Sequence, residues 1–118
     1  MKSKIGGLSK FLYLCTRNTN LYFLYPYMKK FILDLTVTEN IRLNANYVLL
    51  KLTSQSLLPE MLPGQFAELR VDGSPTTFLR RPISINFVDK QRNEVWFLIQ
   101  LLGDGTRRLA EVNPGDVI

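Results

Sequence analysis

Histidine is absent from this 118-residue chain, and cysteine occurs once, at Cys15. Without histidine the chain lacks the commonest general base and metal ligand, which excludes Ser-His and Cys-His nucleophile pairs. A single cysteine excludes an internal disulfide and any iron–sulfur or zinc site built from several thiolates of this chain. We therefore expect the chain to contain no catalytic and no metal-binding residues, so that any chemistry comes from a bound cofactor or a partner.

Acidic residues are absent from the first 30 positions, although six cations lie there: Lys2, Lys4, Lys10, Arg17, Lys29 and Lys30. The whole chain has 15 basic and 10 acidic residues, so residues 31–118 hold nine basic (15 less 6) and ten acidic ones. The net charge of +5 thus belongs to the N-terminal segment, and the rest of the chain is close to neutral. This distribution argues against a basic face that follows a nucleic-acid backbone.

Long apolar runs are also missing. The apolar stretches of residues 1–27 are separated by polar residues 17–20, and none approaches the roughly 18–20 residues that span a membrane. A signal peptide needs a longer apolar centre and a small-residue cleavage site, and neither is present. We expect residues 1–27 to be a disordered leader, or an over-extension upstream of a true start at Met28. A peripheral membrane anchor is the open alternative, and residues 28–118 form the domain.

After residue 30 the apolar residues alternate with polar ones, which is the period of β-strands. The pattern and its turn residues predict five strands, at 31–38, 47–53, 65–71, 83–88 and 94–102. Thr106 is expected to cap a short helix that residues 113–116 terminate, and residues 117–118 begin a sixth strand. We therefore predict an all-β fold, an antiparallel barrel or sandwich of five strands and a truncated sixth, with one short helix near the C-terminus. A strand cut after two residues indicates a fragment.

One stretch, Leu79–Ile85, combines two cations, a proline and a hydroxyl at the start of an apolar run. Arg80 and Arg81 each carry a forked guanidinium that suits phosphate oxygens, and Pro82 favours extended geometry at Arg81. Strand alternation places Ser84 on the face opposite its apolar neighbours. These residues are consistent with an anion site, and equally with a solvated arginine pair at the entry of a strand.

A second candidate lies at Gly105-Thr106, where a helix start offers backbone N–H groups to an anion. An ordinary structural cap explains these two residues as well. Between Arg81 and Gly105 the predicted order is strand, turn, strand, which is a hairpin that returns the chain to its starting end. Arg80 or Arg81 and the Gly105 amide could therefore converge on one pyrophosphate.

Four motifs follow one another in an order and spacing that resemble the FAD-binding barrel of the ferredoxin reductase family. They are Pro63-Gly64-Gln65-Phe66, Arg81-Pro82-Ile83-Ser84, Gly105-Thr106 with Leu109, and Pro114-Gly115-Asp116. Within that family, the form of residues 79–85 and their distance from Gly105 are most similar to the electron-transfer subunits of dihydroorotate dehydrogenase B. The resemblance covers roughly residues 30–118, and it implies a six-stranded antiparallel Greek-key barrel, with the sixth strand truncated in this chain.

The resemblance implies that FAD is the cofactor, with Arg81 on its pyrophosphate, Ser84 near N5 of the flavin ring, and Gly105 and Thr106 capping the phosphates. The implied cofactor-binding residues are Arg81, Pro82, Ile83, Ser84, Leu98, Ile99, Gln100, Gly105 and Thr106. Ile83 stands where many relatives have a stacking tyrosine, and Gln100 where a basic residue is common. Arg80 is either a second phosphate contact or a cation that faces a partner.

The resemblance also implies a larger assembly, whose NAD-binding and [2Fe–2S] domains lie outside this chain. In it, electrons from dihydroorotate pass through the cluster and FAD to NAD⁺, in pyrimidine (UMP) biosynthesis. The implied partner is a catalytic, FMN-containing dihydroorotate dehydrogenase subunit, in a cytoplasmic heterotetramer with two copies of each subunit. No nucleic acid and no membrane is expected as a partner, and this fragment alone is expected only to bind FAD.

Three alternatives stay open. The chain could belong to the electron-transfer subunit of another flavin reductase, of the hydrogenase or sulfite reductase type. It could be a small barrel that binds single-stranded nucleic acid by stacking bases on Trp96 and the tyrosines. Alternatively, it could be a docking module without a ligand, with residues 96–98 as the contact patch.

Overall fold

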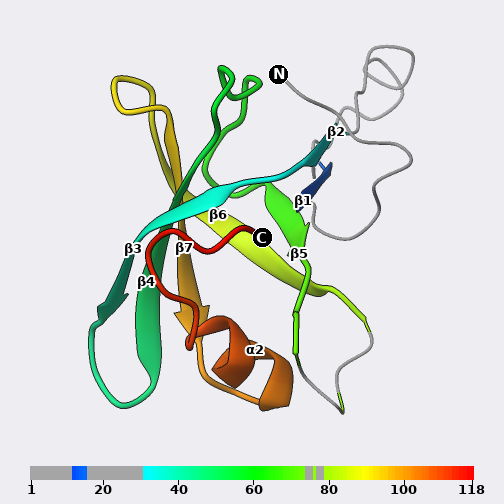
Figure 1. Cartoon of the computed structure of the whole chain (residues 1–118), viewed down its shortest axis with the longest axis vertical. Coiled ribbons are helices and arrows are strands. Elements are labelled where there is room, and N and C mark those ends of the chain that lie inside the picture. Colours follow the sequence, from blue (N-terminus) through cyan, green and yellow to red (C-terminus); the bar gives the residue numbers. More distant parts are fainter. Residues whose placement is uncertain (1–11, 16–30, 74–75, 77–78) are drawn as a thin grey trace.

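The computed structural model describes residues 12–15, 31–73, 76 and 79–118, with the backbone alone described at 12–15 (Figure 1). These residues form seven strands and one helix. They are β1 (Leu12–Cys15), β2 (Phe31–Leu33), β3 (Thr36–Arg42), β4 (Tyr47–Thr53), β5 (Phe66–Leu69), β6 (Arg81–Asp89), β7 (Glu94–Gln100) and α2 (Asp104–Leu109). Within this described part of the chain, no helix is long and apolar enough to cross a membrane.

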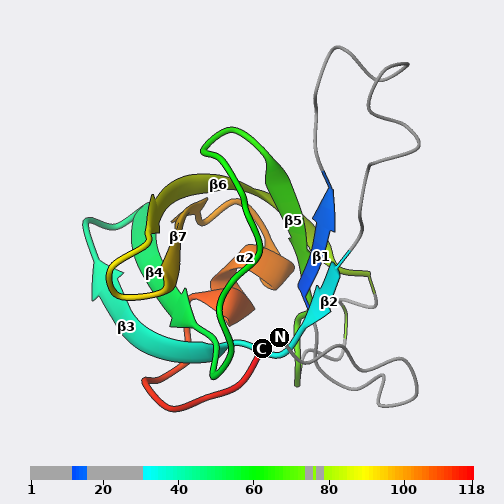
Figure 2. The same ribbon diagram turned by 90° about the horizontal axis from the view of Figure 1, so that it is seen from above.

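The strands form one sheet with the order β2-β1-β5-β6-β7-β4-β3, and every neighbouring pair is antiparallel. Strands β5, β6 and β7 follow one another as hairpins, and β4 lies beside β7, which is a Greek key. β2 and β3 are the first and the last strand in this order. Only Asp34 and Leu35 separate them in sequence, so one continuous stretch of chain forms both outermost strands. Figure 2 shows β3 to β7 curving round in a ring. The predicted all-β antiparallel Greek-key fold is confirmed.

Several element boundaries differ from the sequence prediction. The first predicted strand is divided into β2 and β3, and β3 continues to Arg42 through residues expected in a turn. β1 was not predicted; it pairs with β2 and β5, and the rest of the predicted leader 1–27 lies outside the described residues. The predicted sixth strand is present as an antiparallel bridge from Val117 to Thr36. Beside it Ile118 N–H donates to Leu35 O at 2.8 Å, and Leu35 N–H donates to Ile118 O at 2.9 Å.

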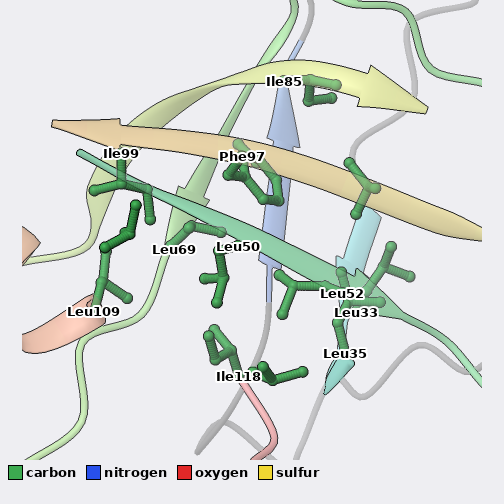
Figure 3. Close-up of a cluster of buried hydrophobic side chains, with 14 of the residues drawn as sticks. Leu33, Leu35, Leu50, Leu52, Leu69, Ile85, Phe97, Ile99, Leu109 and Ile118 are labelled. Atoms are coloured by element: carbon green, nitrogen blue, oxygen red, sulfur yellow. The ribbon is translucent and has the colours of Figure 1, made fainter. Parts of the chain in front are cut away.

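The core lies inside the ring, because each strand buries alternate residues. In β4, for example, Val48, Leu50 and Leu52 are all at most 1% exposed. The buried cluster contains side chains from the six strands β2 to β7, and Leu109 of α2 and Ile118 join them. Figure 3 shows part of this cluster, with the side chains gathered between the strands. Each fully buried aliphatic side chain contributes about 1.5–3 kcal/mol by leaving water. Leu109 thereby fastens α2 across one end of the ring.

The helix α2 begins two residues before the predicted cap. Gly103 is its N-cap, with the extended angles φ −153° and ψ −173°, and Thr106 lies one turn inside. The Thr106 hydroxyl reaches back to accept hydrogen bonds from the N–H groups of Leu102 (3.0 Å) and Gly103 (3.1 Å). The prediction that Thr106 is the N-cap was therefore wrong, because its hydroxyl acts on the preceding residues rather than the following ones.

Candidate functional site

A gap between β6 and β7 provides the site. The ladder between these strands runs from Asp89↔Glu94 to Ile85↔Phe97 and goes no further among the described residues. Before Ile85, residues 81–84 pair with β5, whereas residues 98–100 pair with β4. Neighbouring strands therefore separate at this end of the ring, next to the start of α2, and a cleft of about 590 Å³ opens there. Its lining consists of Thr76, Arg81, Pro82, Ile83, Ser84, Leu98, Gln100, Leu102, Gly103, Asp104, Gly105 and Thr106.

The structure brings eight of the nine predicted cofactor-binding residues to this cleft: Arg81, Pro82, Ile83, Ser84, Leu98, Gln100, Gly105 and Thr106. The ninth, Ile99, lies between two of them on β7, and its side chain is fully buried in the core. Ile99 could therefore meet a ligand through its backbone only. Arg80 is not among the lining residues.

Arg81 is the cation of the cleft. It is the first residue of β6, pairs with Leu69 of β5 and is half-buried. Within the described part of the chain its guanidinium has neither a hydrogen-bond nor an ion-pair partner. In a second hollow of about 400 Å³, by contrast, Arg70 pairs with Asp72 and Arg108 with Glu111, at 2.8 and 2.7 Å. The charge and the five N–H donors of Arg81 thus remain available to an anion in the cleft.

Ser84 of β6 and Gln100 of β7 both line the cleft, one from each of the two strands that separate there. Both are exposed, and the side chain of neither has a hydrogen-bond partner within the described residues. Ile83, which is half-buried, and Leu98, which is 40% exposed, add apolar surface to the lining of the same cleft. An apolar surface with a few unsatisfied polar groups around it is typical of a cofactor site.

The third wall is the segment that leads into α2. A Cβ added at Gly103 would meet no atom within 4 Å, so the missing side chain leaves open space in the lining. Asp104 carries the only negative charge among the described lining residues, and its Oδ2 accepts a hydrogen bond from Thr76 Oγ1 at 3.1 Å. This carboxylate opposes an anion placed directly beside it, whereas it can accept a hydrogen bond from a hydroxyl group.

Sequence reasoning missed Thr76, Leu102, Gly103 and Asp104 as lining residues. The pair of glycines at 103 and 105 was the available signal for the last two, since it marks a backbone that a ligand can approach closely. Thr76 and Leu102 carry no such signal, because their place depends on the arrangement of loops in space. No group of three or more histidine, cysteine, aspartate or glutamate residues in the described ranges is placed to hold a metal ion.

Comparison with known proteins gives relatives of the same kind as the family that the sequence motifs resemble. No family model matches the chain. The electron transfer subunit of dihydroorotate dehydrogenase B (NAD⁺) from Fusobacterium nucleatum subsp. nucleatum is 32% identical over 85 residues, which is 72% of this chain and 33% of that protein. This chain resembles electron transfer subunits of dihydroorotate dehydrogenase B.

Shorter segments match the same subunit from two further bacteria. The Bacillus mycoides protein is 43% identical over 56 residues, covering 48% of this chain and 22% of that protein. The Shouchella clausii protein is 45% identical over 53 residues, covering 45% of this chain and 20% of that protein. The matched part of the chain thus spans a third or less of these electron transfer subunits.

Proposed function

We propose that this chain is the FAD-binding part of an electron transfer subunit of dihydroorotate dehydrogenase B. The observation that carries the proposal is Arg81: a half-buried cation without a protein partner, in a cleft of about 590 Å³. A half-buried charge is costly unless it is compensated, and phosphate oxygens match the forked guanidinium. The similarity to electron transfer subunits favours a flavin nucleotide over other phosphate-containing ligands.

The residues of the cleft fit such a cofactor. Arg81 would bind the pyrophosphate, and the backbone of 103–106 would approach it from the opposite wall, where Gly103 leaves room. Ile83 and Leu98 offer apolar surface to the flavin ring, and the unpaired hydroxyl of Ser84 can donate a hydrogen bond to it. The volume of the cleft lies within the roughly 300–1,000 Å³ of small-molecule sites.

Bound FAD would supply the redox chemistry, and the chain's own task would be to bind and orient the cofactor. We further propose that the whole protein passes electrons from dihydroorotate oxidation to NAD⁺ in pyrimidine biosynthesis. Its partner would be a catalytic FMN-containing subunit, in a cytoplasmic heterotetramer. In this proposal the [2Fe–2S] cluster and the NAD site would lie outside the 118 residues. The single cysteine of this chain cannot supply the several thiolates that such a cluster needs.

The experiment is a titration of the full chain with FAD and, separately, with riboflavin, which lacks the phosphates. Trp96 is the only tryptophan, so quenching of its fluorescence by the flavin reports binding. We expect FAD to bind and riboflavin to bind much more weakly, because one charge-assisted hydrogen bond contributes about 1.5–3 kcal/mol. Equal affinity for the two flavins, or no binding of either, would overturn the proposal.

A further inference from the structure

Asn40 is a polar side chain at an inward-facing position of β3. It pairs with Leu50 of β4, which is fully buried, and directly paired residues of an antiparallel ladder share a face. Asn40 Nδ2 donates two hydrogen bonds, to the carbonyl oxygens of Ala110 and Val112, each at 2.8 Å. Both amide hydrogens are therefore used on two backbone carbonyls that are 70 and 72 residues away in sequence.

These carbonyls lie directly after α2, where a helix leaves its C=O groups without partners within the helix. A helix of six residues has little stability of its own, so contacts with the rest of the molecule decide its position. Leu109 is one such contact, at 2% exposure in the core. Two polar contacts come from the helix itself: Asp104 Oδ2 accepts a hydrogen bond from Thr76 Oγ1, and Arg108 Nε donates one to Asp72 O, each at 3.1 Å. Asn40 holds the segment that directly follows the helix. The opposite end of the same helix, at 103–106, lines the cleft.

We propose that Asn40 is a positioning residue for the cleft: it holds the C-terminal end of α2 so that residues 103–106 stay opposite Arg81. The proposal rests on the proposed flavin-binding function. Asn40 is not itself among the lining residues, and it would act through the helix. The helix α2 is only about 9 Å long. A shift of its C-terminal end at Ala110 therefore also shifts its N-terminal end, which lines the cleft.

Asn93 provides a matched control. Its Nδ2 also donates to two backbone carbonyls, those of Ser54 (3.1 Å) and Ser56 (2.8 Å), but it lies in the β6–β7 turn and fastens the loop after β4. Asn40→Asp and Asn93→Asp each replace an amide by a carboxylate of the same shape, which loses both donors and places an oxygen opposite two carbonyls. Both variants should lose similar stability, whereas only Asn40→Asp should loosen α2.

The test has two readouts on the full-length chain: hydrogen exchange of the backbone amides of 103–109 without ligand, and the dissociation constant for FAD. We expect Asn40→Asp to speed exchange in 103–109 and to weaken FAD binding about tenfold, and Asn93→Asp to change neither by more than about twofold. Each variant is measured at the same number of degrees below its own unfolding temperature. This separates an effect on the position of α2 from a general loss of stability.

Unchanged exchange in Asn40→Asp would overturn the proposal whether or not flavin binds. Faster exchange with unchanged FAD affinity would also overturn it, and would leave the proposed function intact. An equal loss of affinity in both variants would assign Asn40 a purely structural role. If the unsubstituted chain binds no FAD, the proposed function fails, and with it the role of Asn40 toward a flavin.

Discussion

Arg81 stands directly before Pro82, whose ring disfavours helical geometry at the preceding residue. The sequence therefore predicted extended geometry at Arg81, directly before a strand at 83–88. In the structure the strand begins two residues earlier than predicted, with Arg81 as its first residue. The alternation of the next residues is confirmed as well, since Ser84 is exposed and Ile85 is 2% exposed. The lack of a protein partner for Arg81 could not be predicted, because it depends on which acidic residues fold nearby.

Gly103 allows a test of the open space in the cleft. Its φ of −153° suits any residue, and an added Cβ meets nothing within 4 Å, so Gly103→Ala should leave the free energy of unfolding within about 0.5 kcal/mol. The new methyl group occupies cleft volume, and we expect FAD affinity to fall several-fold. Urea denaturation and a FAD titration measure the two effects. Loss of stability without loss of affinity would contradict this assignment.

Gly73→Ala is the comparison that shows what a strained glycine does. Its φ is +74°, and an added Cβ would lie 2.5 Å from Nη2 of Arg108, so this change should destabilise the fold.

Glu39 predicts a pH dependence of stability. Its carboxylate lies 2.7 Å from Lys51 Nζ, and this hydrogen bond, together with the charges of Lys51 and Arg92, lowers the pKa of Glu39 below its ordinary value of 4.5. A carboxyl whose pKa is lower in the folded state adds stability above its unfolded pKa and loses it as pH falls through the folded pKa. Glu39→Gln should therefore reduce the loss of stability below about pH 4.5. Urea denaturation from neutral to acidic pH measures it, and identical pH profiles would contradict the prediction.

At the scale of single elements, the helix α2 was predicted, but its N-cap and the end of β3 were predicted wrongly. Asn40 lies in a segment rich in turn-forming residues, and its local preference favours a turn. In the structure it stays in β3, because two carbonyls of a distant segment accept its amide hydrogens. A contact between residues 70 positions apart has no local signal, so tertiary structure outweighed propensity here.

The β6–β7 turn gives a prediction at the same scale. Asn93 has φ +55°, which asparagine tolerates better than most residues, and its Oδ1 also accepts a hydrogen bond from Leu58 N–H at 2.8 Å. Asn93→Ala should cost about 2–4 kcal/mol, because it loses three hydrogen bonds and adds backbone strain. Urea denaturation checks this value. Asn93→Gly should recover the strain part alone, and equal stability of the two variants would contradict the backbone argument.

At the scale of the whole molecule, alternation and turn residues sufficed to predict an all-β antiparallel barrel or sandwich, and the resemblance to the reductase barrel supplied the Greek-key order. The divergence of β6 from β7 was not predicted, because it depends on where β6 changes its paired strand, from β5 at residues 81–84 to β7 from Ile85 onward. The cleft therefore results from the geometry of the sheet, which the sequence did not predict. Most of the residues predicted from the sequence to bind a cofactor nevertheless line it. The part of the chain that matches known electron transfer subunits spans a third or less of those proteins.

The most direct test compares the dissociation constants for FAD of three full-length chains: the unsubstituted protein, Arg81→Ala and Arg92→Ala. The two substitutions remove the same charge, but Arg92 lies exposed in the β6–β7 turn, away from the cleft lining. We predict that Arg81→Ala weakens FAD binding about ten- to a hundredfold, and that Arg92→Ala changes it by less than about twofold. Equal affinity in the two variants would contradict the assignment of the cleft as a flavin site.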